Sequence, residues 1–364
     1  MIPDIIKRIS ASQKKYGAVT DGDWDNKNRQ FDALDVYDAF LKRVNEKKEW
    51  RETEYYRRIL SQVKSGDYVY GIRTEEDLIE RTKYLDSLYE CIKTKGYLLN
   101  RDNCEYNVAF DEIQVAIGRN GEYILKDGIH RLSIAKIIGV ESVPVTVFVR
   151  HKKWQDIRNF VYGYAKDQLY GGKLYQPITH PDFVDIPYDA LNHDYNNLME
   201  SLTRNLGKEN GTLLDIGANT GFWSFKFEDL GYHCYAVERD PTACQIMEKM
   251  KIANNKKFTI INKSIFDLDL VKEKKFDVVL ALSCFHHFLK TKNSYFQFID
   301  LLKNLKTNEL FFEPHKHNET QMREAYANYT ETQFVDFVSS HTSLSNSEMI
   351  FTDINGRHVF KLTK

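Results

Sequence analysis

A short apolar strand that runs into a glycine-rich turn constrains this chain more than any other feature. The stretch LLDIGANTG (213–221) places two apolar residues before the turn, and an aromatic helix follows it. Gly217 allows a sharp turn, and Gly221 allows a ligand to approach the backbone closely. A second apolar strand, YAVE (235–238), ends in Glu238. A carboxylate about twenty residues after such a turn can accept hydrogen bonds from both ribose hydroxyls, so the pattern predicts a parallel α/β site for a nucleoside.

The turn has the form Asp-x-Gly-x-Asn-x-Gly, not G-x-G-x-x-G, and it resembles motif I of class I S-adenosylmethionine (SAM) methyltransferases. The likeness continues downstream with three more expected strands and a polar segment beside the transferred methyl. These segments are FTII (258–261) followed by Phe266-Asp267, FDVVLAL (276–282) followed by SCFHH (283–287), and LFFE (310–313). The resemblance covers roughly residues 195–364 and implies a Rossmann-like α/β sheet. The alternatives are a nicotinamide-binding Rossmann domain and a purely structural turn.

The resemblance also implies which residues serve the reaction. Methyl transfer from a sulfonium is an in-line displacement, in which the protein aligns donor and acceptor and removes a proton from a poor nucleophile. His286 and His287 are the candidate catalytic groups, as a base or as donors to a negative oxygen; the alternative is one core histidine and one hydrated histidine. The residues expected at the SAM cofactor are Asp215, Gly217, Asn219, Gly221, Glu238, Asp267 and Ser283.

The bulk composition limits the class of protein. A chain of 364 residues suits two domains, and a net charge of −1 gives no basic field that would favour nucleic acid. The five cysteines are irregularly spaced without a zinc-site pattern, which favours a reducing, cytoplasmic location. No apolar run is long enough to span a membrane. Ile2, Ile5, Ile6 and Ile9 form a helical stripe near basic residues; we expect it to dock on its own protein, with peripheral membrane contact as the alternative.

Residue periodicity and turn signals divide the chain into four parts. We expect a helical N-terminal extension (1–70), an α+β domain (71–150), an irregular linker with a loop that can reach a site (151–195) and the methyltransferase domain (196–364). The expected elements are a helix from a capping box at Thr74 to Gly96, strands near 113–117, 123–125 and 143–149, a helix at 131–138 stopped by Gly139, and a closing hairpin within 348–362 around Asn355-Gly356.

A second motif, DGIHR (127–131), lies in the N-terminal half. A strand, a glycine turn and a helix start leave free backbone N–H groups, which suit an anion. Arg131 can bind phosphate with two hydrogen bonds, and His130 can donate a hydrogen bond or move a proton. The alternative is an ordinary turn with a hydrated arginine.

The order of elements around this motif resembles the ParB/sulfiredoxin-like fold over roughly residues 70–150. The resemblance implies that Gly128, His130 and Arg131 bind nucleotide phosphates. Ile129 stands where sulfiredoxin needs its reactive cysteine, so we expect a phosphotransferase that uses ATP or ADP with Mg²⁺. Glu112 and Asp127 are candidate carboxylates for the metal, and His130 and Asp127 are candidate catalytic groups; solvated carboxylates are the alternative.

Three functions follow as hypotheses. The segments around FHH (285–287) and FEPH (312–315) resemble the methyltransferases that terminate bacterial surface polysaccharides, some of which are joined to a kinase. The first hypothesis is therefore a methyltransferase with a nucleotide-dependent kinase domain, acting on a glycan or a small phosphorylated acceptor. A cationic cluster of His315, Lys316, His317 and Arg323 would suit such a phosphate. The alternatives are a nucleic-acid methyltransferase with a ParB-like DNA-binding domain and a methyltransferase with a non-catalytic binding module.

Overall fold

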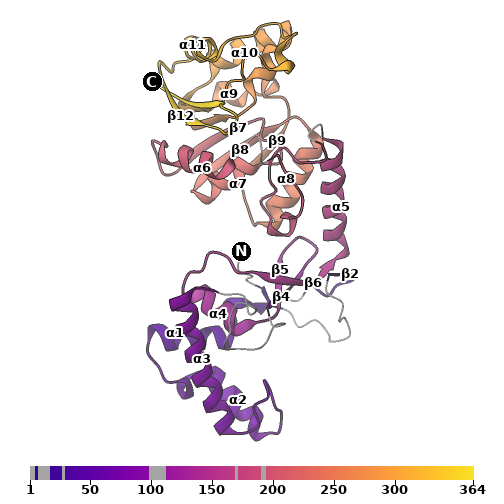
Figure 1. Ribbon diagram of the computed structural model, residues 1–364, viewed down its shortest axis with the longest axis vertical. Helices are drawn as coiled ribbons and strands as arrows, with labels where there is room; N and C mark the ends of the chain where they lie inside the picture. Colours follow the sequence, from indigo (N-terminus) through magenta and orange to yellow (C-terminus); the bar gives the residue numbers. More distant parts are fainter. Residues whose placement is uncertain (1–4, 7–16, 27–28, 98–111, 169–170, 190–193) are drawn as a thin grey trace. The chain divides into compact units, whose positions relative to one another are not determined.

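The computed structural model divides the chain into two compact units, Met1–Arg158 and Asn159–Lys364, and each is described by itself (Figure 1). The structure describes residues 5–6, 17–26, 29–97, 112–168, 171–189 and 194–364. In this part of the chain, no helix has both the length and the apolar character needed to cross a membrane.

A seven-stranded sheet forms the centre of the C-terminal unit. Its strands lie in the order β12-β13-β11-β10-β7-β8-β9, and the five from β7 to β11 are parallel. The bounds are β7 Gly211–Ile216, β8 Tyr232–Glu238, β9 Thr259–Asn262, β10 Phe276–Ala281, β11 Thr307–Phe312, β12 Asn346–Thr352 and β13 His358–Thr363. The strand order reverses between β7 and β10, and ligands of such sheets bind at the carboxyl ends of the strands on either side of that reversal.

Helices cover both faces of this sheet. Figure 1 shows α6 (Tyr195–Arg204), α7 (Phe222–Asp229) and α8 (Pro241–Ala253) on one face, and α9 (Leu270–Glu273), α10 (Lys292–Asn304) and α11 (Glu331–His341) on the other. On the face covered by α9, α10 and α11, the core contains buried aromatic residues, including Phe276, Phe298, Phe312 and Phe334. The sequence-based prediction of a Rossmann-like α/β sheet is confirmed, and so is the closing hairpin, in which β12 and β13 are antiparallel and Gly356 has a φ of 71°.

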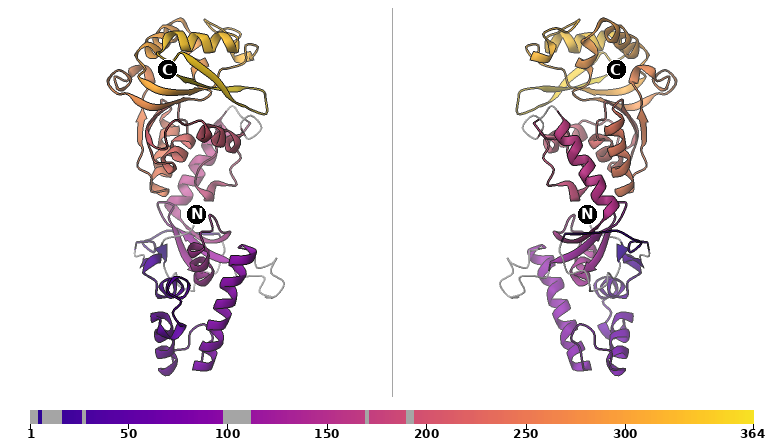
Figure 2. Two further views of the ribbon diagram at one scale, coloured as in Figure 1. Left: turned by 90° about the vertical axis from the view of Figure 1, so that its left-hand side faces the viewer. Right: turned by 90° about the vertical axis from the view of Figure 1, so that its right-hand side faces the viewer.

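The N-terminal unit contains a six-stranded sheet in the order β2-β6-β4-β5-β1-β3. Its strands are β1 Ile5–Ile6, β2 Ala18–Thr20, β3 Arg29–Gln30, β4 Ile113–Ile117, β5 Tyr123–Asp127 and β6 Val145–His151. The helices α1 (Asp35–Asn45), α2 (Glu54–Lys64), α3 (Glu75–Lys95) and α4 (Ile129–Ile137) pack on one another, with α4 against α1 and α3 (Figure 2). The elements expected between residues 74 and 151 are present, including the capping box of Thr74 and Asp77.

Residues 1–70, predicted as a helical N-terminal extension, contain the helices α1 and α2 and also three strands. The strands β1, β2 and β3 come from this stretch and join the N-terminal sheet. Ile5 and Ile6, expected on a helical stripe, form β1 and pair in parallel with Ile124 and Leu125 of β5. β-branched residues fit a pleated sheet well, and sheet pairing overrides a helical spacing in so short a segment. Ile2 and Ile9 lie outside the described residues.

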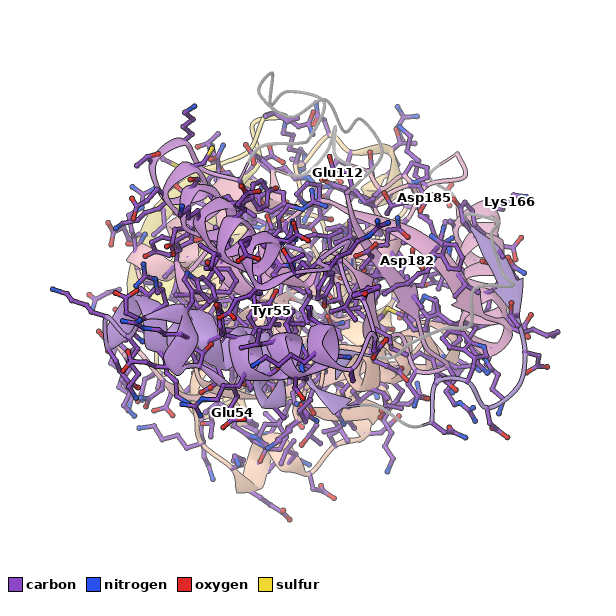
Figure 3. The ribbon with its side chains drawn as sticks, turned by 90° about the horizontal axis from the view of Figure 1, so that it is seen from below. Glu54, Tyr55, Glu112, Lys166, Asp182 and Asp185 are labelled. Carbon is purple, nitrogen blue, oxygen red and sulfur yellow. The ribbon has the colours of Figure 1, made fainter. Side chains whose placement is uncertain are left out.

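The prediction that residues 151–195 are irregular is wrong for their first part. Residues Lys152–Asp167 form α5, in which Trp154, Val161 and Ala165 are buried. Their spacing of seven and four residues places them on one face of a helix, a pattern that the many aromatic residues obscure in the sequence. From residue 171 to 189 the chain is a loop that contains a short 3-10 turn, Pro181–Phe183; Asp182 and Asp185 of this loop are labelled in Figure 3.

Candidate methyltransferase site

The turn between β7 and α7 can form only because two of its residues lack a side chain. Gly217 has a φ of 75° and Gly221 a φ of 89°. A Cβ atom on Gly217 would lie 2.8 Å from the Sγ atom of Cys284, and one on Gly221 would lie 2.7 Å from Cγ of Met247. Both positions therefore need glycine for the backbone conformation and for the close packing of the turn.

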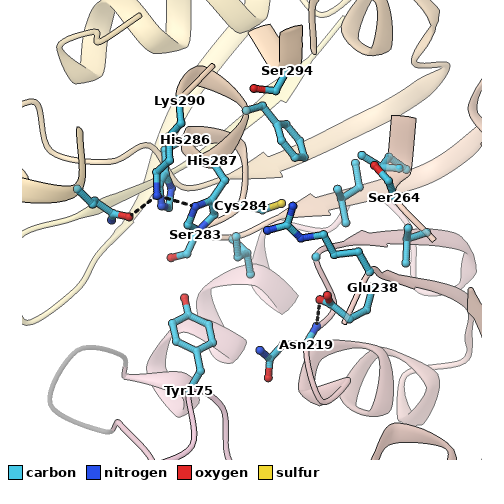
Figure 4. Close-up of a pocket in the computed structure, with 18 of the residues that line it drawn as sticks. Tyr175, Asn219, Glu238, Ser264, Ser283, Cys284, His286, His287, Lys290 and Ser294 are labelled. Carbon is cyan, nitrogen blue, oxygen red and sulfur yellow. Dashed lines mark hydrogen bonds between the residues drawn. The ribbon is translucent and has the colours of Figure 1, made fainter. Parts of the chain in front are cut away.

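Glu238 is fixed beside this turn at the end of β8. Its Oε2 accepts a hydrogen bond from the backbone N–H of Asn219 at 2.9 Å, and its Oε1 accepts one from the N–H of Asp240 at 2.8 Å (Figure 4). Each carboxylate oxygen has a second lone pair, so the group can still accept hydrogen bonds from a ligand. The predicted proximity of Glu238 to the glycine turn is thus present in the fold.

Asp215, predicted at the cofactor, lies at the end of β7 and is not among the residues that line the cavity described below. Only 3% of it is exposed, and its Oδ2 accepts a hydrogen bond from the hydroxyl of Ser224 at 2.7 Å. Burial raises the pKa of Asp215 to about 7, against the opposing effect of the Ser224 hydrogen bond. In this structure Asp215 therefore joins the end of β7 to α7, and its predicted contact with the cofactor stays a prediction.

A cavity of about 1010 Å³ opens at the carboxyl ends of β7, β8, β9 and β10. It is lined by six of the residues predicted for the site: Gly217, Asn219, Glu238, Ser283, His286 and His287. Gly221 and Asp267 are not among the lining residues, and Asp267 is exposed. Phe266, its neighbour, lines the cavity with Ser264 and Ile265, so an aromatic and an aliphatic surface follows β9, where Asp267 was expected to contact the cofactor.

The wall of the cavity after β10 is built around Ser283, which has a φ of 51°. Its hydroxyl donates a hydrogen bond to Glu313 at 2.8 Å and accepts one from Arg357 at 3.2 Å. Arg357 also pairs with Glu313 at 3.2 Å and with Glu319 at 2.7 Å. Burial raises the pKa of Glu313, and Arg357 and the hydrogen bonds oppose that rise. The turn before β13 is thereby tied to the segment after β10.

His286 and His287 lie in the short turn Phe285–Leu289, with ring centroids 4.1 Å apart. His286 is 2% exposed, and its Nδ1 has no hydrogen-bond partner among the described residues. Burial lowers the pKa of His286 to about 2, with a smaller contribution from His287, so the ring is neutral at pH 7. His287 is exposed to the cavity, and desolvation and the Lys290 ammonium group, 3.0 Å from its Nδ1, lower its pKa.

Several lining residues were not predicted as site residues. Lys290, Arg239 and Arg357 bring positive charge to the cavity, and Tyr175 and Asp189 reach it from the 171–189 loop. Arg239 could have been predicted as a site residue because it directly follows Glu238. Lys290 could have been predicted because it lies three residues after His287. Of the predicted cationic cluster, only Lys316 lines the cavity. His315 is buried with its Nε2 bonded to Asn328, and His317 and Arg323 are exposed.

The second motif differs from its expected geometry. α4 begins at Ile129, with Gly128 as its N-cap residue at a φ of 90°, and the Asp127 carboxylate accepts a hydrogen bond from the Gly128 N–H at 2.7 Å. A Cβ on Gly128 would lie 2.9 Å from Cγ1 of Ile113, so packing alone requires this glycine.

His130, on α4, is only 8% exposed and lies between two tyrosine rings, 5.9 Å from Tyr55 and 5.3 Å from Tyr70 between centroids. Its Nε2 is 3.2 Å from the Tyr55 hydroxyl. Burial lowers the pKa of His130 to about 3, followed by the effect of Arg81. This environment gives His130 a packing role within the helices, and its role in phosphate chemistry stays a prediction.

Arg131 forms an ion pair with Glu112 at 3.6 Å; Figure 3 labels Glu112 and Tyr55. Among the residues that the structure describes, no three His, Cys, Asp or Glu side chains gather in a group that could hold a metal ion. The predicted roles of Glu112 and Asp127 toward Mg²⁺ therefore stay predictions.

Comparison with known proteins agrees with this geometry. Residues 214–306, which contain the glycine turn, Glu238 and the two histidines, match the family described as "Methyltransferase domain". The C-terminal unit therefore contains a segment that matches this methyltransferase family. Its α/β fold and this match together support a SAM-dependent enzyme of class I. No curated protein sequence matches the chain.

Solved structures resemble part of the chain distantly. One is WbdD in complex with a kinase inhibitor, at 17% identity and a TM-score of 0.43, covering 57% of this chain and 47% of that chain. Another is magnesium protoporphyrin IX methyltransferase from Synechocystis PCC 6803 with bound SAM, at 13% identity and a TM-score of 0.40, covering 57% of this chain and 97% of that chain. The chain spans about half the length of the WbdD structures it matches. These values decide neither substrate nor reaction.

Proposed function

We propose that the C-terminal unit transfers a methyl group from SAM to an oxygen atom of its acceptor. The observation that carries the proposal is the position of Glu238, bonded to the glycine turn at Asn219, in the cavity that also contains Ser283, His286 and His287. Glu238 would bind the ribose hydroxyls, and the turn would lie along the rest of the cofactor. The methyl group would then face the wall after β10.

His287 would take the proton of the acceptor. The acceptor oxygen attacks the methyl carbon, the sulfur–carbon bond breaks, and S-adenosylhomocysteine leaves as a neutral thioether. The proton moves from the acceptor oxygen to the imidazole ring of His287, which lines the cavity and is exposed to it. A low histidine pKa does not prevent this step, because a methylated, still protonated oxygen is far more acidic than an ordinary hydroxyl. His287 would then pass the proton to water in the cavity.

Calorimetry with S-adenosylhomocysteine tests the cofactor site. Glu238→Ala removes two charge-assisted hydrogen bonds and should weaken binding by about 1.5–3 kcal/mol for each. Gly217→Val should abolish binding, because its side chain would fill the turn. Glu248→Ala is the matched control, since Glu248 is exposed on α8 and outside the cavity lining. Unchanged affinity in both site variants, each shown to be folded at the temperature of the titration, would sink the cofactor assignment.

For the acceptor, we propose a glycan or a small phosphorylated molecule of surface-polysaccharide biosynthesis. Lys290 and Lys316 line the cavity and can bind phosphate or sugar oxygens, which supports a polar acceptor. Transfer of label from methyl-labelled SAM to a panel of sugars and sugar phosphates tests this. Label on apolar acceptors alone would contradict it.

For the N-terminal unit, we propose nucleotide binding at Gly128 and Arg131, coupled to phosphotransfer with ATP or ADP and Mg²⁺. The glycine turn that opens α4 and the cationic Arg131 support it. Arg131→Ala should weaken nucleotide binding and leave S-adenosylhomocysteine binding unchanged. If the full chain binds none of ATP, ADP, GTP and CTP in the presence of Mg²⁺, a non-catalytic binding module replaces this proposal.

A further inference from the structure

A lysine side chain contacts His287, the histidine proposed to take the proton of the methyl acceptor. Phe285–Leu289 is a short 3-10 helix, and Lys290 is its C-cap residue. A 3-10 helix has three residues per turn, so side chains three positions apart lie one above the other. The Nζ atom of Lys290 lies 3.0 Å from Nδ1 of His287, and both residues line the cavity (Figure 4). The local helix thus brings the two groups into one hydrogen bond.

Lys290 is also held from the side away from the histidine. Its Nζ atom donates a hydrogen bond to Oε1 of Gln321 at 3.1 Å, and Gln321 donates from Nε2 to Glu319 at 2.7 Å. The carbonyl of Lys290 accepts a hydrogen bond from the N–H of Tyr326 at 3.2 Å, which fixes the backbone. A continuous hydrogen-bonded chain therefore runs from the His287 ring through Lys290 to the Gln321 amide.

The protonation state of Lys290 decides which ring nitrogen of His287 carries the proton. An ammonium group can only donate, so Nδ1 accepts and the neutral ring keeps its proton on Nε2. A neutral amine has one lone pair, so it accepts from a protonated Nδ1 and still donates to Gln321. Nε2 then carries no proton. Only in this second state does the ring offer a free nitrogen to the acceptor.

The charges around this pair keep the ring neutral and weaken the hold of Lys290 on its proton. They come from several segments: Arg239 after β8, Glu319 after β11, Arg357 before β13 and His286 in the same turn. Desolvation, followed by the Lys290 charge, lowers the pKa of His287 to about 4. Desolvation also lowers the pKa of Lys290; Glu319 opposes this shift and Arg239 adds to it. At pH 7 the ring is therefore neutral, and Lys290 sets its tautomer.

We propose that Lys290 is the positioning residue behind His287, and that its neutral amine takes the Nδ1 proton when Nε2 receives the proton of the acceptor oxygen. This inference rests on the proposed function. The O–H bond of the methylated acceptor breaks and an N–H bond forms at Nε2, while the Nδ1–H bond breaks and an N–H bond forms at Nζ. Loss of the Nε2 proton to water, with return of the Nζ proton to Nδ1, restores the starting state. The ring is never doubly protonated, so no imidazolium forms beside Arg239.

The tautomer of His287 tests the inference without any acceptor. The full chain with isotope-labelled histidine is titrated by NMR, and the His287 signals are assigned with His287→Gln. In the wild type, the ring proton should lie on Nε2 near pH 7 and move to Nδ1 as pH rises and Lys290 loses its charge. In Lys290→Arg it should stay on Nε2 throughout, because a guanidinium group keeps its proton. In Lys290→Met, which removes the neighbouring charge, the pKa of His287 should rise.

Transfer of label from methyl-labelled SAM to the sugar phosphates of the acceptor panel gives the kinetic test. Lys290→Arg keeps the positive charge, so the KM of the acceptor should stay within about threefold while kcat falls about 10- to 100-fold. Lys290→Met should keep a higher kcat than Lys290→Arg, with the rise in rate moved to lower pH. A role of Lys290 as a charge alone predicts the reverse order. Lys292→Met is the control, since Lys292 is exposed and outside the cavity lining.

A His287 tautomer that does not change with pH in the wild type would overturn the inference, and so would a wild-type kcat in Lys290→Arg. If Lys290→Arg does not fold, an unchanged pKa of His287 in Lys290→Met would overturn it equally. The proposed function fails separately, through unchanged S-adenosylhomocysteine affinity in Glu238→Ala and no label on any acceptor. The NMR titration still decides the role of Lys290 in that case.

Discussion

Gly217 and Asp215, two residues apart, show how the end of β7 is specified at the scale of single residues. Gly217 combines a left-handed φ of 75° with a position where any Cβ would approach Cys284. Asp215 is a buried carboxyl group whose one described side-chain partner is the Ser224 hydroxyl. The first residue is required by space and backbone conformation, and the second adds a titratable group beneath the turn. Each leads to a measurable prediction.

Gly217→Ala should lower the free energy of unfolding through two separable effects, one from the backbone conformation and one from a steric contact. The left-handed backbone costs about 1–2 kcal/mol for a residue with a Cβ, and the contact with Cys284 adds about 1–3 kcal/mol. Gly231→Ala is the matched control, since Gly231 has a φ of 89° and the nearest atom to its Cβ would be 3.6 Å away. Chemical denaturation should show a larger loss at Gly217 than at Gly231. Cys284→Ala in the Gly217→Ala background should recover part of the difference, since it removes Sγ and keeps the Cβ atom at 3.3 Å. Equal losses at the two glycines would refute the steric argument.

Asp215 should make stability depend on pH. Its pKa is about 7 in the folded state, above the value of an exposed aspartate, so the folded state retains a proton that the unfolded state releases. The contribution of Asp215 to the free energy of unfolding is therefore fully present below about pH 4 and is lost as pH rises toward 7. Asp215→Asn cannot titrate and can still accept from Ser224. Between pH 4.5 and 8, the variant should gain a few kcal/mol relative to the wild type, at about 1.4 kcal/mol for each pKa unit. Parallel pH profiles would contradict the assignment.

At the scale of elements, the C-terminal hairpin contributes to the cavity through Arg357. This residue follows the turn at Gly356 and reaches Ser283 after β10 and Glu313 after β11. Three segments that are far apart in sequence thus meet in one hydrogen-bonded group. The strained φ of Ser283 persists because Glu313 and Arg357 both form hydrogen bonds with its hydroxyl.

Arg357→Met should cost about 3–5 kcal/mol, because it leaves the buried Glu313 carboxylate without its cationic partner. The pKa of Glu313 is already raised by burial and should rise further in this variant. A carboxyl group whose pKa is raised in the folded state contributes less to the stability of the protein as pH increases, so the stability deficit of this variant should shrink as pH falls. The double variant Arg357→Met/Glu313→Gln should recover part of the loss in denaturant titrations at pH 7. A deficit that is independent of pH would argue against the pairing as its cause.

At the scale of the whole molecule, the two compact units divide within α5, at Arg158 and Asn159. The sequence-based boundary between linker and methyltransferase, at residue 196, remains a prediction. The loop before that boundary packs on the C-terminal unit. Gln176 is hydrogen-bonded to Phe222, and Tyr195 is hydrogen-bonded to Tyr175.

Two fragments test this division. Residues 152–364 start at the first residue of α5 and should unfold cooperatively and bind S-adenosylhomocysteine like the full chain. Residues 196–364 lack the 174–189 loop, and they should lose stability because the buried side chains of Leu174, Phe183 and Ile186 no longer cover their neighbours. Thermal unfolding and calorimetry on both fragments provide the comparison. Equal stability and affinity would show that the loop is dispensable.

The sequence by itself determined the sheet of the C-terminal unit and the centre of its candidate site. Apolar runs of four to seven residues mark β7 to β11, and the glycine turn and Glu238 follow from local rules about φ, spacing and parallel strands. The capping box at Thr74, the turn at Gly356 and the stop of α4 at Gly139 also depend on neighbouring residues only. Such features are predictable because their physical cause lies within a few residues of chain.

Only the tertiary structure decided which distant residues share the cavity. Nothing in the local pattern distinguishes Tyr175, Asp189 or Arg357 from other loop residues, because their positions depend on how far-apart segments pack. The same cause explains the errors: β1 and β3 form by pairing with each other and with β5, and α5 was hidden by its aromatic composition. His130 and Asp267 were both predicted as site residues from short motifs. In the structure His130 is buried against Tyr55, and Asp267 is exposed outside the cavity. Both positions depend on tertiary packing, which a short motif does not encode.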